Sequence, residues 1–133
     1  MTRSSADLSK QAVEGGQERS QAVKRRKRRG RHHVYVIELA RDVLQHRKFR
    51  AANPQRDPEK CCLYVGMTGL TPDIRFERHK AGVKDNSYVR LYGRWLRPDL
   101  YAELNPLPYK EAQRMEQVLA RELRNDGFAV WQK

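Results

Sequence analysis

The chain has 133 residues, of which 38% are hydrophobic and 33% charged, a composition that supports one modest hydrophobic core and excludes two. Its 28 lysines and arginines against 16 acids give a formal net charge of +12, which favours a polyanionic partner, most commonly nucleic acid. No apolar stretch approaches the roughly 20 residues of a membrane span, and the N-terminus lacks the apolar core of a secretory signal, so we expect a cytoplasmic protein without a membrane partner.

Basic residues gather at the N-terminus. Residues 1–31 hold ten lysines and arginines against three acids and contain almost no β-branched or aromatic side chains. Such a segment has little apolar surface to bury, so we interpret residues 1–31 as a disordered, flexible basic arm. Its consecutive bases are expected to contact nucleic-acid phosphates; they are Lys24, Arg25, Arg26, Lys27, Arg28 and Arg29. The alternative is a passive tail or a ribosome-facing arm.

Two strands are expected at the start of the remaining chain. Residues 34–39 and 61–66 are rich in β-branched, aromatic and aliphatic side chains, a pattern typical of strands. The polar stretch between them contains an Asn-Pro and an Asp-Pro pair, which are turn signals. A short helix is predicted in the first part of this stretch, over residues 41–50.

A helix is predicted over residues 72–81. Thr71 is a favourable N-cap, Pro72 suits the first helical position, and the charge of Asp73 suits the positive N-terminal turn. Gly82 is expected to end the helix.

The C-terminal half predicts four more elements. Residues 87–96 indicate a short helix, and residues 100–104 a third strand. Residues 109–125 predict a long helix, and residues 128–131 a short final strand. The expected order is β-β-α-α-β-α-β, a mixed α/β domain.

The long helix carries a glutamate in an unusual place. At 100° per residue, Glu116 falls within the apolar stripe of this helix, which is formed by Ala112, Met115, Leu119 and Leu123. A carboxylate on a core-facing stripe is costly unless it is paired or bound to a metal. The alternative to a metal ligand is a boundary glutamate that pairs with an arginine.

Two other pairs of side chains could act chemically. Arg75 and His79 are four residues apart and therefore share one face of the first helix; arginine can hold a phosphate, and histidine can move a proton. Tyr35 and Tyr64 lie in the two expected strands, where their hydroxyls could orient a water molecule. A solvated helix face and ordinary sheet packing are the structural alternatives.

Two further groups have weaker functional interpretations. A zinc site would require paired ligands two to four residues apart, a spacing absent from His32, His33, Cys61 and Cys62. The adjacent cysteines also do not indicate a disulfide framework. Aromatic residues alternate with arginines between residues 88 and 97, as in surfaces that stack nucleobases. However, the spacing of Tyr88, Tyr92 and Trp95 favours packing into the core.

The order of these residues resembles the GIY-YIG nuclease superfamily, and small bacterial members most of all. His33-Val34-Tyr35 and Tyr64-Val65-Gly66 are similar to its Gly-Ile-Tyr and Tyr-Ile-Gly motifs. Residues 75–79 resemble its Arg-Leu-x-x-His helix, and Glu116 stands where the family has its metal-binding glutamate. The resemblance covers about residues 33–131.

The chain departs from the family pattern in three ways. His33 replaces the first glycine, and the long separation of the two tyrosines makes about residues 41–60 an insertion. Met67 stands where several members have lysine, which removes a possible phosphate contact and bears on the expected rate, not on the fold.

The resemblance implies both a fold and an activity for residues 32–133. It implies a small GIY-YIG-type α/β domain with a central, mostly antiparallel three-stranded sheet flanked by helices. It also implies an endonuclease that hydrolyses phosphodiester bonds in DNA with one Mg²⁺ (or Mn²⁺) and no small-molecule cofactor. Its target and oligomeric state stay open.

The family also implies roles for the matched residues. Glu116 would bind the metal, and Tyr35 or Tyr64 would orient or deprotonate the attacking water. Arg75 would offset charge on the phosphate, and His79 would hold a tyrosine or the phosphate in place.

Two alternatives remain. The domain could be a nucleic-acid-binding module on the same fold that does not cleave, with Glu116 and Arg75 forming only an ion pair. It could also be an RNA- or ribosome-associated basic protein, although it lacks an aromatic RNA-binding signature.

Overall fold

A computed structural model of the chain describes residues 30–83 and 86–132. The predicted basic arm therefore lies outside the described residues except at its last two positions. Within the described part, no helix combines the length and the apolar character that crossing a membrane would require.

Four strands form one mixed sheet in the order β3-β1-β2-β4. β1 (His33–Leu39) is antiparallel to both β2 (Cys62–Thr68) and β3 (Gly93–Leu96), whereas β4 (Ala129–Gln132) is parallel to β2. The expectation of a mostly antiparallel sheet is confirmed. The expectation of three strands is wrong, because the sheet has four. The C-terminal strand adds to the sheet beside β2 and makes it four-stranded and mixed.

The predicted third strand at residues 100–104 is also wrong. Two 3-10 turns, Pro98–Leu100 and Ala102–Leu104, occupy this region. Proline lacks the N–H that a strand ladder needs, so a strand cannot extend easily through residue 98. Leu100 and Tyr101 are still buried, because the turns pack against β1.

The third strand lies earlier, inside the segment predicted as a helix over residues 87–96. There α5 (Ser87–Tyr92) ends after six residues and the chain turns directly into β3. Gly93 permits this turn, because a Cβ at this position would lie 2.5 Å from the carbonyl oxygen of Val89. The hydrophobic pattern of the sequence does not report such a backbone contact, so it could not predict where the helix ends and the strand begins.

The segment between β1 and β2 is part of the core. It forms a 3-10 turn at Arg41–Gln45 and α3 at Arg47–Ala51, and it buries Val43 and Phe49 completely. Buried Asn53 joins this segment to the sheet, since its side-chain oxygen accepts a hydrogen bond of 2.8 Å from the backbone N–H of Val130. Its amide nitrogen donates to the carbonyl oxygen of Phe49 at 2.9 Å.

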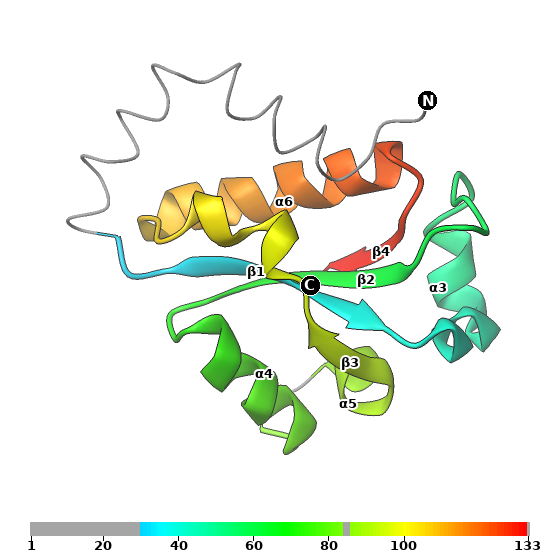
Figure 1. The fold of residues 1–133 in the computed structure, drawn as a ribbon, viewed down its shortest axis with the longest axis horizontal. Coiled ribbons are helices and arrows are strands. Elements are labelled where there is room, and N and C mark those ends of the chain that lie inside the picture. Colours follow the sequence, from blue (N-terminus) through cyan, green and yellow to red (C-terminus); the bar gives the residue numbers. More distant parts are fainter. Residues whose placement is uncertain (1–29, 84–85, 133) are drawn as a thin grey trace.

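The two main helices begin and end close to where their capping signals predict. α4 spans Pro72–Lys80, and its N-cap Thr71 accepts a hydrogen bond of 3.3 Å from the backbone N–H of Ile74. Gly82 follows it with a left-handed φ of 84°, which favours glycine. α6 spans Tyr109–Asn125. In Figure 1, α6 lies on one side of the sheet, and α4 and α5 lie on the other.

Candidate active site

The two tyrosines meet on one face of the sheet. In the β1–β2 register, Tyr35 lies opposite Gly66 and Tyr64 lies opposite Ile37, so the tyrosines are diagonal neighbours with ring centroids 6.2 Å apart. Both side chains are almost completely buried. A Cβ at Gly66 would lie 2.6 Å from the hydroxyl oxygen of Tyr35 and 3.0 Å from a ring carbon of Tyr64. The absence of a side chain at Gly66 therefore leaves the space that the Tyr35 ring occupies.

We predict that Gly66→Ala destabilises the domain and displaces the Tyr35 hydroxyl. Adding a methyl group to a packed site typically costs about 1–3 kcal/mol, which urea denaturation can measure. Gly69→Ala is the matched control, because its Cβ would lie 3.5 Å from the nearest atom, a ring nitrogen of His32, at ordinary contact distance. Equal stability of the two variants would contradict the prediction.

His79 on α4 fixes the orientation of Tyr35. The imidazole is 1% exposed, and its Nε2 lies 2.9 Å from the Tyr35 hydroxyl oxygen. Its Nδ1 accepts a hydrogen bond of 3.1 Å from the backbone N–H of Asn86. An accepting Nδ1 places the proton of the neutral ring on Nε2, so His79 donates to the Tyr35 oxygen.

The hydroxyl of Tyr35 in turn hydrogen-bonds to Tyr64. This contact raises the pKa of Tyr35 and lowers that of Tyr64. Burial is the main cause that raises both pKa values; for Tyr64 it brings the pKa to about 12, and for Tyr35 the pKa lies well above the ordinary range. Hydrogen bonds therefore connect His79 to Tyr35 and Tyr35 to Tyr64, and Tyr64 is the more acidic tyrosine.

The charges of Arg75 and Glu116 shift the pKa of Tyr64 in opposite directions. The positive charge of Arg75 opposes the rise in pKa of both tyrosines, and its guanidinium also hydrogen-bonds to Tyr35. Its Nη1 donates to the carbonyl oxygen of Val83 at 3.2 Å. The negative charge of Glu116 raises the pKa of Tyr64, second only to burial.

Glu116 is buried on α6, as its place in the apolar stripe predicts. The side chain is 8% exposed, and its Oε2 atom is shielded from solvent. The buried residues of this helix are Ala112, Glu116, Leu119, Ala120 and Leu123; Met115 is only partly buried. The structure thus brings Tyr35, Tyr64, Arg75 and His79 into one cluster. Glu116, on α6, affects this cluster through its negative charge, which raises the pKa of Tyr64.

The donor set suits a weakly held hard cation and not a closed metal site. Among the described residues, no group of three or more histidine, cysteine, aspartate or glutamate side chains is arranged so that it could hold a metal. The two histidines and two cysteines considered above as a zinc site are among the residues searched. Cys61 and Cys62 are free thiols. Mg²⁺ keeps several waters and is commonly bound through one or two carboxylates and a substrate phosphate. The buried carboxylate of Glu116 fits such an ion.

The aromatic residues between 88 and 95 divide into two groups. Tyr88 and Tyr92 pack partly buried against the core, as the periodicity predicts. Trp95 is 47% exposed, so its predicted place in the core is wrong. It lies opposite Glu38 on the edge strand β3, and its Nε1 donates to the Glu38 carboxylate at 3.3 Å. Trp95 is exposed because β3 is an edge strand. A local sequence pattern does not show which strand lies at the edge of a sheet.

Sequence reasoning did not identify Asn86 as part of the site. Asn86 is the N-cap of α5, where its side chain accepts a hydrogen bond from the backbone N–H of Tyr88. The same cap geometry presents the backbone N–H of Asn86 to His79. An asparagine directly before an expected helix was the available signal.

Comparison with family models, curated proteins and solved structures finds no match to this chain.

Proposed function

We propose that this chain is a metal-dependent endonuclease that hydrolyses phosphodiester bonds in DNA. The supporting observation is the buried, hydrogen-bonded cluster of His79, Tyr35 and Tyr64, whose pKa values respond to a cationic side chain, Arg75, and an anionic one, Glu116. A buried cluster of this kind can orient a nucleophile, and perturbed titratable groups of this kind are typical of catalytic sites. The net charge of +12 supports a polyanionic substrate.

Tyr64 is the proposed general base. Its contact with Tyr35 and the charge of Arg75 both lower the pKa of Tyr64, so both favour the phenolate. In the proposed step, the oxygen of a water molecule forms a bond to phosphorus and its proton passes to the Tyr64 phenolate. The bond from phosphorus to the leaving oxygen breaks, and that oxygen is protonated from solvent.

Arg75 and His79 support this step in different ways. Arg75 offsets the charge that develops on the phosphoryl oxygens, and removal of one such donor typically lowers the rate about 10²- to 10³-fold. His79 is a positioning residue, because its imidazole acts only through the Tyr35 oxygen. The proposed roles therefore use all the residues of the cluster.

Glu116 would hold Mg²⁺ or Mn²⁺. When bound there, the ion supplies Lewis-acid polarisation of a phosphoryl oxygen. The carboxylate itself has a second effect, because its negative charge raises the pKa of Tyr64.

We predict that the full chain cleaves DNA with Mg²⁺ and shows no cleavage with EDTA. The assay uses duplex, nicked, flap and branched DNA, because the residues of the described cluster do not select among them. Activity lost with EDTA should return when Mg²⁺ or Mn²⁺ is added in excess. DNA binding without cleavage of any substrate in either metal would favour the non-cleaving module. Preferential cleavage or binding of RNA would favour the RNA-associated alternative.

A further inference from the structure

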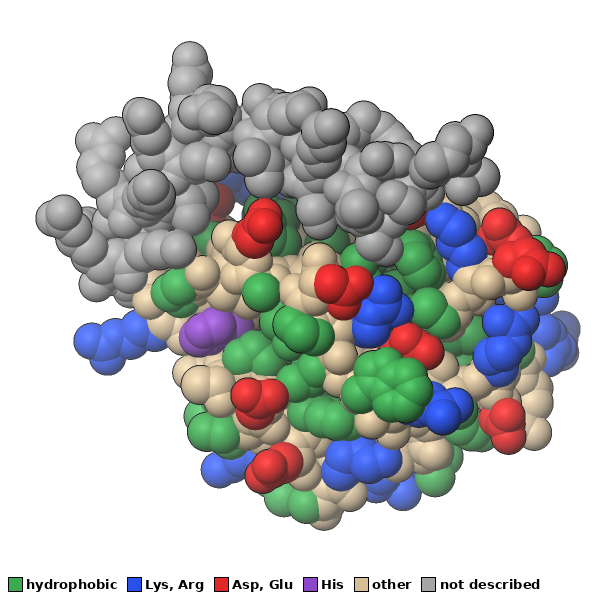
Figure 2. All heavy atoms as spheres, viewed as in Figure 1, with side chains coloured by type: hydrophobic (Ala, Val, Ile, Leu, Met, Phe, Trp, Pro, Cys, Tyr) green, Lys and Arg blue, Asp and Glu red, His purple; other side chains and the backbone are tan. Residues whose placement is uncertain are grey.

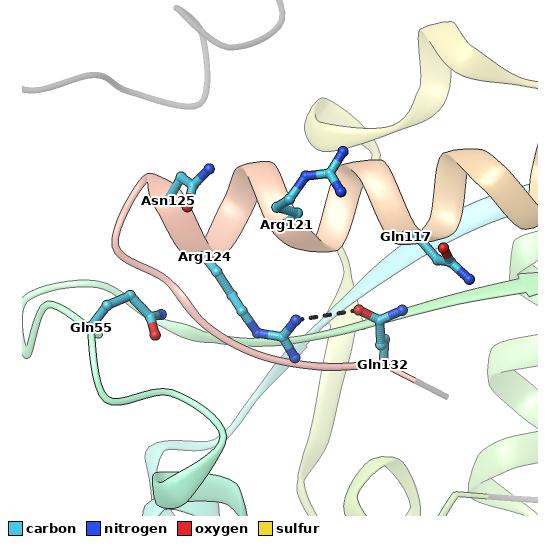
Figure 3. A pocket seen from close by; sticks show the side chains of 6 residues that line it. All are labelled: Gln55, Gln117, Arg121, Arg124, Asn125 and Gln132. Carbon is cyan, nitrogen blue, oxygen red and sulfur yellow. Dashed lines mark hydrogen bonds between the residues drawn. The ribbon is translucent and has the colours of Figure 1, made fainter.

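A second polar site lies between the C-terminal half of α6 and β4, separate from the tyrosine cluster. Figure 3 shows this pocket, in which Arg124 extends from α6 toward β4 and hydrogen-bonds to Gln132. Among the described residues, its lining contains two arginines, four amide side chains and no acid; these residues are Gln55, Gln117, Arg121, Arg124, Asn125 and Gln132.

Positive charge in this pocket is not neutralised by carboxylates of the described residues. Arg124 is half-buried and donates only to neutral oxygens; these belong to Val130 at 3.0 Å and to Asn53 and Gln132 at 3.3 Å each. Within residues 30–83 and 86–132, neither Arg121 nor Arg124 takes part in an ion pair. Burial lowers the pKa of Arg124, which is the cost of a cation without an anionic neighbour.

Arg124 keeps donors for a ligand. A guanidinium has five N–H groups, and the hydrogen bonds to the described residues use one each on Nε, Nη1 and Nη2. One N–H on each Nη therefore remains as a donor for a phosphate oxygen. The amides of Gln117 and Asn125 can donate as well, and the exposed side chain of Arg121 adds a second positive charge.

This arrangement differs from the mixed charges on the face of the molecule in Figure 2. On the face in Figure 2, blue and red side chains are interspersed wherever the atoms are not grey, so charges of opposite sign lie near one another. Two neighbouring arginines without a carboxylate in the lining are therefore a local feature that general basicity does not explain.

We propose that this pocket binds a backbone phosphate of DNA, away from the bond that is cut. The identity of the polymer rests on the proposed function, whereas the phosphate chemistry rests on the pocket alone. Arg121 and Arg124 follow Glu116 by five and eight positions on the same helix. At about 1.5 Å per residue this is about 8–12 Å along the axis, or roughly two to four nucleotides at about 3.4 Å each. One helix would thus relate the cleavage site to a second contact on the same backbone.

Duplex binding in EDTA tests the proposal without cleavage. Arg121→Gln should weaken binding and reduce the slope of log K against log salt by about 0.9, the value for one phosphate contact. Asn125→Asp changes one lining amide to a carboxylate of the same shape and should also weaken binding severalfold. Arg47→Gln, an exposed arginine on α3 outside the pocket, is the matched control and should leave the slope unchanged.

The outcomes separate this proposal from the nuclease function. Wild-type affinity and salt slope in both Arg121→Gln and Asn125→Asp would overturn the pocket, even if the chain cleaves DNA. Reduced affinity in both variants, with an unchanged Arg47→Gln, would support the pocket even if no metal-dependent cleavage occurs. An equal loss in all three variants would also overturn it, because it would indicate general charge attraction. Arg124 is not varied, since it also holds Asn53 and β4 together.

Discussion

Glu116→Gln is expected to abolish Mg²⁺-dependent cleavage while the protein stays folded and binds DNA. The change keeps the shape of the buried side chain and removes only the charge that would hold the cation. Loss of a preorganised electrostatic contact of this kind lowers the rate by on the order of 10²- to 10³-fold. Single-turnover cleavage at saturating DNA measures the rate, and anisotropy in EDTA measures binding.

The same variant has a second readout that does not depend on activity. Because the charge of Glu116 raises the pKa of Tyr64, its removal should lower that pKa from about 12 toward the ordinary value of a tyrosine. Ultraviolet titration of the phenolate in metal-free protein detects the shift. Glu122→Gln on the same helix is the matched control and should change neither rate nor titration. Full activity of Glu116→Gln would remove this residue from the proposed mechanism.

Tyr64→Phe is expected to lower the cleavage rate by about 10²- to 10⁴-fold, the usual contribution of a general base. The ring that packs in the sheet is retained, so the fold should persist. Below a pKa of about 12 the phenolate fraction rises about tenfold per pH unit, so the wild-type rate should increase with pH. In Tyr64→Phe this increase should disappear, which a pH–rate profile between neutral and alkaline pH measures.

Tyr35→Phe should differ from Tyr64→Phe in stability as well as in rate. Its loss leaves the buried Nε2–H of His79 without its acceptor, and an unsatisfied buried donor costs about 1–3 kcal/mol. The rate should fall less than in Tyr64→Phe, because Tyr35 acts only through its contact with the proposed base. Tyr101→Phe, a buried tyrosine on the turns beside β1, is the control for loss of a hydroxyl. Two fully active variants at Tyr35 and Tyr64 would exclude tyrosine from the mechanism.

Elements whose signals are local could be predicted well. The N-cap at Thr71 and the glycine at Gly82 determine the ends of α4, because capping depends on backbone groups within a few residues. The apolar period of α6 is also local, and it is sufficient to place Glu116 on the buried face of this helix.

Elements that depend on distant partners could not be predicted. Residues 93–96 form a strand only because β1 offers them an edge, and residues 100–104 are too close to Pro98 to continue one. The parallel pairing of β4 with β2 likewise joins segments more than sixty residues apart in the chain. Short apolar segments acquire their structure from whatever backbone lies beside them.

The sequence by itself therefore determined the two principal helices, the first two strands, the short final strand and the residue types available for chemistry. Only the tertiary structure decided how those types are connected: the proton of His79 lies on Nε2 because Asn86 donates to Nδ1, and Tyr35 fits because Gly66 has no side chain. It likewise gave Arg124 a neutral partner from a distant segment, Asn53, in addition to the nearby carbonyl oxygen of Val130. Hydrogen-bond direction, clearance and charge compensation are properties of pairs of groups, and the chain brings these pairs together only when it folds.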